Sequence, residues 1–381
     1  MIENINTGVH IIDTEAALKK ISAGLEENKV VAVDLEADSM YHFKEKVCLV
    51  QLATKTASFA VDPLQIKDLS ALKPLFSNPA VKKIFHGADY DVRSLYRDFQ
   101  MEIKNLFDTE LACRFLGLKE TGLDTVLQER FNLRLDKKFQ KKDWSKRPLP
   151  ADMIEYAAKD VIYLIPLAEI LEKEISEKGR MEWLHEECEN LCKVRHVSGR
   201  TEPLFLKFKG AGKLDSRDLA VLEALLSFRK AVAEKKDKPL FKIIRNESLL
   251  KITRAKPATL KRLKEINALS ETQVDMYGKT LIETVKKALK IPKKNQPVYP
   301  RNKGPVLEYA VTKRIKSLKS WRDVTAQELE LEPSMLFPKS LLTAIAVLNP
   351  RKLVDLNKIK EMKNWHKREF GGAILKVLQK V

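Results

Sequence analysis

Short apolar runs alternate with helical patterns along the first 110 residues. Four runs have the length of buried strands: residues 30–33, 47–53, 57–61 and 82–85. Between and after them, apolar positions recur at helical spacing over residues 69–76 and 89–99. Strands followed by helices are typical of an α/β domain, so we predict a mixed central sheet with helices packed against it.

From about residue 108 to residue 194 the apolar periodicity is helical. Residues 139–150 interrupt it with Lys, Arg and Pro, which predicts an ordered loop before a helix that begins near Ala151. Pro166 falls inside the helical pattern that follows, and a proline there removes a backbone hydrogen bond. We therefore expect a kink at that point.

The second half of the chain predicts two small all-α modules. Residues 196–215 and 291–305 contain several Gly, Pro or Lys residues and have the composition of linkers. The two helical blocks that they separate have similar lengths and each opens with a basic helix, which favours two copies of one module. The predicted domains are residues 1–200, 210–291 and 303–381.

Charge is distributed unevenly along the 381 residues. The net charge is +18, of which residues 1–200 contribute −3 and residues 201–381 contribute +21. A polyanionic partner such as nucleic acid is the simplest explanation of so basic a second half. A merely solvated basic surface is the alternative.

Composition limits the class of protein. No run reaches 18 apolar residues, so we predict no membrane span. The segment after Met1 lacks a basic stretch followed by an apolar run, so we expect no secretory signal and a cytoplasmic location. The four cysteines are scattered, as in a protein with reduced thiols. Cys188 and Cys192 lack a second pair that would complete a zinc site, and we interpret them as a pair on a helix surface.

Carboxylates follow the first predicted strand. Asp34 and Glu36 stand two residues apart, and alternate residues of an extended chain point to the same side. Further along, Asp91 comes five residues after His86 and just after the predicted strand 82–85. We expect Asp89 to be the N-cap of the following helix and Asp91 to lie in its first turn. Capping alone would also explain acids at these positions.

A third element lies on the helix predicted from Ala151. Tyr156 and Asp160 are four residues apart and therefore share one helix face. A hydroxyl and a carboxylate would project into the same space, although an amphipathic helix with a half-buried tyrosine gives the same pattern.

The three elements together predict a metal centre. Four carboxylates, Asp34, Glu36, Asp91 and Asp160, suit two divalent cations, Mg²⁺ or Mn²⁺, about 3.5–4 Å apart. Such a pair of ions activates a water and stabilises the leaving oxygen of a displacement at phosphorus. We expect Tyr156 to orient that water, because a phenol with a pKa of about 10 is a poor base.

These motifs resemble the three exonuclease motifs of the DEDD superfamily. Asp34-Leu35-Glu36, then Asp91 after His86-Gly87, and Tyr156 with Asp160 match its tyrosine subclass. Residues 143–149 resemble the loop before the third motif in the ribonuclease D family, and the helical blocks resemble tandem HRDC domains. The resemblance implies a ribonuclease H-like fold. It also implies a metal-dependent 3′→5′ exoribonuclease that trims stable RNA precursors, notably tRNA, and releases 5′-mononucleotides.

Two further segments are candidates for contact with substrate. Tyr41, His42 and Phe43 follow the first motif, where aromatic rings either stack on terminal bases or cover the sheet edge. Trp144 and Arg147 either brace the site or contact phosphate, and we favour bracing.

Two other functions remain open on the sequence. The same chemistry serves a DNA exonuclease, because discrimination rests on contacts to the 2′-hydroxyl that no motif reveals. A non-catalytic RNA-binding protein on a nuclease scaffold is disfavoured, since all four acids are present. No motif indicates an obligate protein partner.

Overall fold

The computed structural model describes residues 8–196, 202–300 and 307–381, which form two compact units. The first unit comprises Met1–Ala37, Val47–His196 and Pro305–Val381. The second comprises Asp38–Lys46 and Val197–Gly304. The last helical block thus belongs to the same unit as the sheet. The predicted domain limits at residues 200 and 303 lie outside the described residues.

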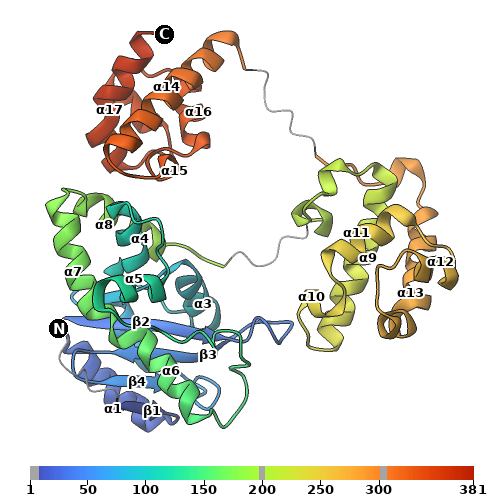
Figure 1. The fold of residues 1–381 in the computed structure, drawn as a ribbon, viewed down its shortest axis with the longest axis horizontal. Helices are drawn as coiled ribbons and strands as arrows, with labels where there is room; N and C mark the ends of the chain where they lie inside the picture. The colour runs from blue at the N-terminus through green and yellow to red at the C-terminus, as the bar shows by residue number, and fades with distance from the viewer. Residues whose placement is uncertain (1–7, 197–201, 301–306) are drawn as a thin grey trace. The chain divides into compact units, whose positions relative to one another are not determined.

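A six-stranded mixed sheet forms the centre of the first unit (Figure 1), as predicted. Its strands are β1 (Val9–Ile12), β2 (Val30–Ala37), β3 (Val47–Ala53), β4 (Ser58–Val61), β5 (Lys82–Phe85) and β6 (Leu106–Asp108). They lie in the order β1-β4-β3-β2-β5-β6, with β3 antiparallel to both its neighbours and the other pairs parallel. Strand β2 is therefore central and is longer than predicted, so that Asp34 and Glu36 lie within it.

Helices pack against this sheet and against one another. The helices of the first unit up to residue 196 are α1 (Glu15–Glu26), α2 (Lys73–Ser77), α3 (Asp89–Phe99), α4 (Thr109–Leu116), α5 (Leu123–Phe131), α6 (Ala151–Ile162), α7 (Leu164–Glu177) and α8 (Met181–Cys192). Helix α6 begins where predicted and packs across β2, β3 and β4. Helix α6 ends at Ile162 and α7 begins at Leu164, so the helix is interrupted at Tyr163, three residues before Pro166. The helical register is thus interrupted near the predicted kink.

The turn before α3 corrects one prediction. Asp89 is not the N-cap: the cap residue is Ala88, and Asp89 instead forms an ion pair with Arg93 in the next turn. The carboxylate of Asp108, at the end of β6, accepts hydrogen bonds from the backbone N–H groups of Gly87 and Ala88 at 2.9 and 2.8 Å. A residue from a neighbouring strand therefore holds the turn that leads to Asp91.

The C-terminal helical block packs on the sheet domain through aromatic side chains. Its helices are α14 (Tyr309–Glu328), α15 (Pro333–Leu336), α16 (Lys339–Leu348) and α17 (Asn364–Gln379). Trp365 of α17 stacks on Trp183 of α8 with ring centroids 4.8 Å apart, and Phe115 of α4 meets both indoles edge-on. One hydrophobic core therefore runs through both parts of the first unit.

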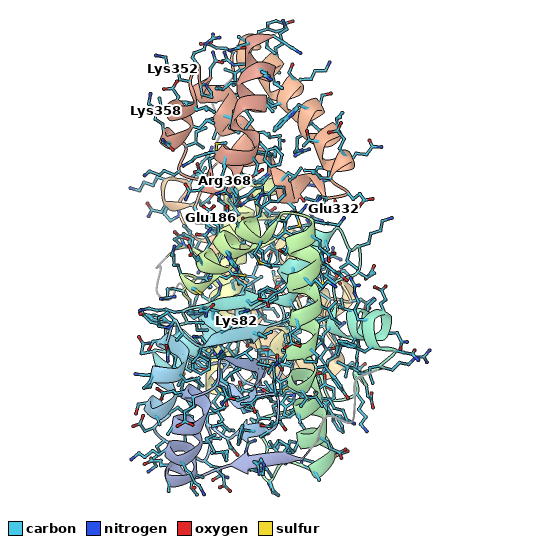
Figure 2. All side chains as sticks on the ribbon, turned by 90° about the vertical axis from the view of Figure 1, so that its left-hand side faces the viewer. Lys82, Glu186, Glu332, Lys352, Lys358 and Arg368 are labelled. Atoms are coloured by element: carbon cyan, nitrogen blue, oxygen red, sulfur yellow. The ribbon has the colours of Figure 1, made fainter. Side chains whose placement is uncertain are left out.

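Polar contacts fix the same junction. The Arg180 guanidinium, buried, donates to the carbonyl oxygens of Phe115 and Leu329 at 2.6 and 2.7 Å. Gly117 has φ +88°, and a Cβ there would lie 2.1 Å from the Glu330 carbonyl oxygen. Glu186 lies at this junction (Figure 2), and its carboxylate accepts from the first two N–H groups of α17 at 2.8 and 2.9 Å. Backbone and side chains of α4, α8 and α17 thus fit one another closely.

Replacing Glu186 by Ala is expected to weaken this junction. Loss of a helix-capping side chain costs about 0.5–2 kcal/mol, and each kcal/mol lowers a melting temperature by roughly 2–4 °C in a unit of this size. Calorimetry of the full chain measures the shift. Glu189→Ala removes an exposed acid from the same helix and is the control. Equal melting temperatures for the Glu186 variant and the unaltered chain would show that the cap does not contribute.

The second unit is a small helical module. Its helices are α9 (Ser216–Lys235), α10 (Leu240–Ile243), α11 (Asn246–Ala255), α12 (Leu260–Glu265) and α13 (Glu271–Leu289), preceded by the short turns η2 (Leu204–Lys207) and η3 (Ala211–Lys213). The linker prediction is wrong for residues 204–214, because Phe205, Phe208 and Leu214 are buried in the core of this module. Gly and Pro there shape tight turns between apolar residues that pack.

The structure bears on two predictions made from composition, the absence of a membrane span and the state of the cysteines. No helix within residues 8–196, 202–300 and 307–381 has the length and apolar character needed to cross a bilayer. All four cysteines are free thiols. The interpretation of Cys188 as a helix-surface residue is wrong, since it is 2% exposed on the face of α8 that packs against β6.

Candidate active site

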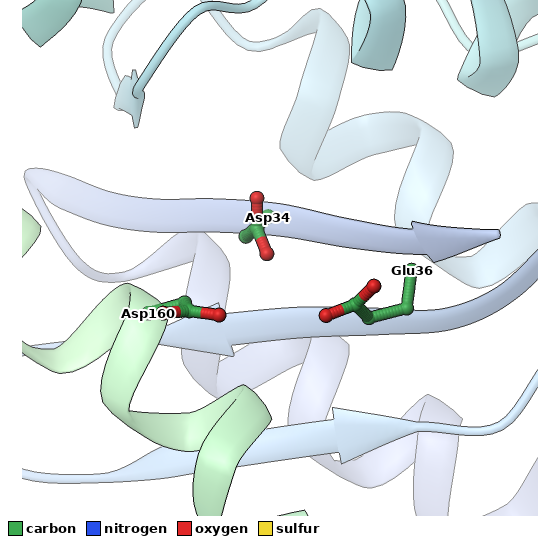
Figure 3. Close-up of side chains that lie close together, drawn as sticks. All are labelled: Asp34, Glu36 and Asp160. Carbon is green, nitrogen blue, oxygen red and sulfur yellow. The ribbon is translucent and has the colours of Figure 1, made fainter. Parts of the chain in front are cut away.

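Three carboxylates meet above the central strand. Asp34 and Glu36 project from β2, and Asp160 reaches toward them from α6 (Figure 3). One ligand oxygen of each lies within 4.8 Å of one oxygen of each of the others. The strand spacing puts the first two on one side, and the packing of α6 across β2 brings in the third.

Asp91 stands next to this group but outside it. It lies in the first turn of α3 and is 6% exposed. Its charge raises the pKa of Glu36, and the Asp34 charge in turn raises the pKa of Asp91, so the four acids share one electrostatic site. The four acids predicted from the sequence therefore lie together: Asp34, Glu36 and Asp160 are close to one another, and Asp91 lies beside them.

Burial raises the pKa of every one of these acids. Desolvation is the largest cause throughout, and it brings the pKa of Asp34 to about 7 and that of Asp160 to about 8. The pKa values of Glu36 and Asp91 are also well above their ordinary range, with neighbouring carboxylates adding to the effect of burial. Four such groups near neutral pH are held together at a cost in free energy.

The donor set fits divalent cations. Within the described parts of the chain, none of the four acids forms an ion pair with Lys, Arg or His. Carboxylate oxygens are the ligands that Mg²⁺ and Mn²⁺ prefer, and a bound cation removes the mutual repulsion that raises these pKa values. The cluster therefore needs positive charge, and the side chains of the described residues do not supply it.

Tyr156 borders the same cluster. It lies one helical turn before Asp160, whose carboxylate is near enough to raise the pKa of the Tyr156 hydroxyl. Burial and the nearby acids raise the pKa of Tyr156 far above 10, so the phenol stays protonated. Its ring packs between Phe139 and Trp144, with centroids 5.7 and 6.2 Å away. The side chain is therefore a fixed hydrogen-bond donor rather than a base.

The loop before α6 braces this arrangement. Trp144 is 1% exposed and packs in a small core with residues of β3 and α6. The Arg147 guanidinium forms an ion pair with the buried Asp62 and donates to the carbonyl oxygens of Cys48, Trp144 and Lys146. These contacts occupy the donors that an RNA phosphate would need, and they match the bracing alternative.

Tyr41, His42 and Phe43 are engaged by the helical module of the second unit. The Asp237 carboxylate accepts from the backbone N–H of Phe43 and lies 2.7 Å from Nδ1 of His42. Lys242 lies over the Tyr41 ring at 4.0 Å. The segment belongs to the second unit, so the structure does not place it among the clustered acids.

A cavity of about 490 Å³ opens beside the acids and contains, besides His86, residues that no motif indicated. Its lining includes His86, Glu110, Asp124, Asp136, Lys137 and Gln140. Lys137 forms an ion pair with Asp124 at 2.8 Å, and Nδ1 of His86 lies 2.9 Å from the Thr109 hydroxyl. These residues come from α4, from α5 and from the segments before α3 and after α5, so no local spacing could have grouped them. The bond to Thr109 agrees with His86 as a residue of the turn.

Comparison with known protein families identifies both parts of this architecture. Residues 9–176 match the model of the 3′-5′ exonuclease domain, and residues 218–285 and 311–378 each match the HRDC domain. The exonuclease match contains all four acids and Tyr156.

Individual proteins are similar over most of the chain. Ribonuclease D of Haemophilus influenzae is 31% identical over 75% of this chain and 72% of its own length. Exosome complex component 10 of Rattus norvegicus is 30% identical, but the match covers only 29% of that longer protein. The crystal structure of Escherichia coli RNase D, described as an exoribonuclease involved in structured RNA processing, is 25% identical. It aligns with a TM-score of 0.71 over 98% of this chain and 99% of that chain. The chain belongs to the ribonuclease D family of 3′→5′ exoribonucleases.

Proposed function

We propose that this protein trims the 3′ ends of stable, structured RNA precursors such as tRNA and releases 5′-mononucleotides by two-metal hydrolysis. The observation that carries the proposal is the group of unpaired carboxylates beside a protonated tyrosine. The Escherichia coli relative processes structured RNA, which supports the same substrate class here.

Asp34, Glu36, Asp91 and Asp160 would hold two divalent ions, Mg²⁺ or Mn²⁺. Bound there, the ions lower the pKa of a water molecule and neutralise charge on the leaving oxygen. The four acids come from three elements, β2, α3 and α6. This arrangement suits two ions with different tasks. The buried carboxylates would hold the ions without contributing a base.

Tyr156 orients the reacting groups in this proposal. Its ring is held by Phe139 and Trp144, so the hydroxyl has a fixed position next to the acids. A phenol that stays protonated donates a hydrogen bond and accepts no proton. Positioning of this kind raises the rate because the attacking water meets phosphorus in line.

The HRDC domains would hold the RNA backbone. Residues 202–300 contain 23 Lys and Arg against 11 Asp and Glu, a net charge of +12. Contacts of such residues with phosphates release counterions, so binding that rests on them weakens steeply with salt. The near-neutral exonuclease domain lacks a comparable excess of positive charge, which supports a division between holding and cutting.

A 3′-extended tRNA is the test substrate. Incubation with Mg²⁺ is expected to shorten it from the 3′ end and to release 5′-mononucleotides, whereas excess chelator stops the reaction. A circular RNA and an RNA ending in a 3′-phosphate are expected to resist, because the family acts from a free 3′ end. Internal fragments from the circular RNA would contradict the proposal. Faster cleavage of a matched DNA would favour a DNA exonuclease instead.

A further inference from the structure

A buried cation without an acidic partner lies in the second unit. Arg229 of α9 is 6% exposed. One of its terminal nitrogens donates to the Ile244 carbonyl oxygen at 3.0 Å and to the Asn246 side chain at 2.7 Å. Its Nε is buried without a hydrogen-bond partner, and within the described residues no carboxylate pairs with the guanidinium.

Such an arrangement is unusual for a structural arginine. Buried charges in proteins are normally paired with an opposite charge and fully hydrogen-bonded. Burial lowers the pKa of Arg229, which reflects the cost of removing the cation from water. Holding the turn between α10 and α11 uses one nitrogen with two neutral acceptors. That role leaves the charge and the Nε proton unexplained.

The same arginine borders a cavity of about 290 Å³. Lys207 and Lys230 are exposed at its lining and form no ion pair within the described residues, whereas Glu202 is the one acid that lines it. The remaining lining is mainly apolar: Pro203, Leu204, Phe208, Leu226 and Leu240. The cavity therefore combines three cations with an apolar surface that includes an aromatic ring.

One wall of this cavity is held in place by a carboxylate. Glu223 of α9 accepts hydrogen bonds from the backbone N–H groups of Leu204 and Phe205 at 3.0 and 2.9 Å. Turn η2, which carries Leu204 and Lys207, is thereby fixed to the helix that carries Arg229 and Lys230. The cations and the apolar wall are thus positioned by the fold before any ligand arrives.

We propose that this cavity binds one nucleotide unit, with its phosphate on Arg229, Lys207 and Lys230 and its base against the apolar wall. A phosphate supplies a negative charge beside the Arg229 guanidinium and acceptors for the two exposed lysines. A base is flat and apolar enough to pack on Phe208 and the neighbouring leucines, as bases do on aromatic side chains. The volume suits one nucleotide rather than a duplex.

Two sources supply such a unit: a nucleotide within single-stranded RNA, or a free 5′-mononucleotide. We favour the RNA chain, an assignment that rests on the proposed RNA substrate. A nucleotide held in this module would act as a second anchor on the strand, separate from the end that is cleaved.

Methyl NMR of the full chain with labelled leucines tests this inference in EDTA, where cleavage is stopped. The probes are a 5′-phosphorylated tetra-adenylate, AMP and inorganic phosphate. The tetra-adenylate is expected to shift the methyl resonances of Leu204, Leu226 and Leu240. Lys207→Ala/Lys230→Ala is expected to weaken that binding about tenfold or more, since hydrogen bonds to charged groups are lost. Lys286→Ala/Lys287→Ala removes the same charge from exposed positions of α13 and is the matched control.

The probes distinguish the outcomes. Shifts with the tetra-adenylate alone assign the site to an RNA chain, and equal affinity for AMP assigns it to free nucleotides. Identical shifts and affinity with inorganic phosphate would overturn the base contact. No shift of the three leucines with any probe would overturn the site. The proposed function has a separate readout, because the unaltered chain should degrade a short RNA in Mg²⁺ whatever the three leucines show.

Discussion

Replacing Asp34 by Asn is expected to slow RNA cleavage in Mg²⁺ by roughly 10³-fold or more. Metal ions contribute several kcal/mol of charge stabilisation, and each 1.36 kcal/mol corresponds to a factor of ten in rate. Glu36→Gln and Asp160→Asn should have similar effects, because the three carboxylates lie within 4.8 Å of one another. Single-turnover cleavage of a short RNA at saturating enzyme measures the loss.

Glu129→Gln is the control for these variants, since Glu129 is an exposed acid on α5. Its rate should equal that of the unaltered chain. Wild-type turnover of the Asp34 variant, or full activity in excess chelator, would rule out the proposed metal site.

The same variants should be more stable than the unaltered chain when metal is absent. The pKa of Asp34 in the folded chain is about 7, above its ordinary value of 3.8. Between these two pH values the folded chain retains a proton that the unfolded chain has lost, so stability contributed by this group falls as the pH rises through 7. In EDTA, Asp34→Asn should therefore raise the melting temperature at pH 8 and change it little at pH 4. A lower melting temperature at pH 8 would show that the carboxylate is stabilising.

Replacing Tyr156 by Phe is expected to lower the cleavage rate by about 10²–10⁴-fold, the usual range when a hydrogen-bonding group that acts in the transition state is lost. RNA affinity should hardly change, because the ring and its contacts with Phe139 and Trp144 remain. Single-turnover rates over a range of enzyme concentrations separate the two quantities.

Tyr163→Phe is the matched control, since Tyr163 is a half-buried tyrosine at the end of the same helix. The pH dependence carries a second test. Because the pKa of Tyr156 is raised far above 10, no loss of rate from ionisation of this phenol is expected between pH 7 and 9. An unchanged rate in Tyr156→Phe would remove the hydroxyl from the mechanism.

Elements with strong local patterns could be predicted from the sequence. β3 and β5 were predicted over their full length, and α3 and α6 from their first residue, because apolar spacing and flanking polar residues agree there. β1, β6 and α1 were not predicted. The first two are the edge strands of the sheet, and β6 has only three residues.

In the candidate site, too, residues related by local spacing could be predicted, and residues brought together by tertiary packing could not. Asp34 with Glu36, and Tyr156 with Asp160, are related by the geometry of one strand and one helix, so their spacing predicts that they meet. The Asp108 carboxylate that holds the turn before Asp91 comes from a different strand. Lys137 and Gln140 reach the cavity through tertiary packing. Contacts of this kind leave no signal in a single sequence.

The charge distribution alone suggests separating the two halves near residue 200. The packing argues against that experiment, because such a fragment lacks α17 and would expose Trp183 and Phe115 to water. Loss of activity in the fragment would then report unfolding rather than lost RNA binding. Charge-neutralising substitutions in the full chain keep the two effects apart.

The contact between Trp183 and Trp365 also sets an order of events during synthesis. About 180 residues separate the two indoles, and a ribosome adding 5–20 residues per second needs roughly 10–40 s to produce them. Throughout that interval the newly made sheet domain presents an uncovered aromatic face, while the intervening HRDC domain has already emerged and can fold. The middle of the chain is therefore expected to reach its native state early. The first unit can close only after the last helix leaves the ribosome, so this aromatic face is the last part of its core to be buried.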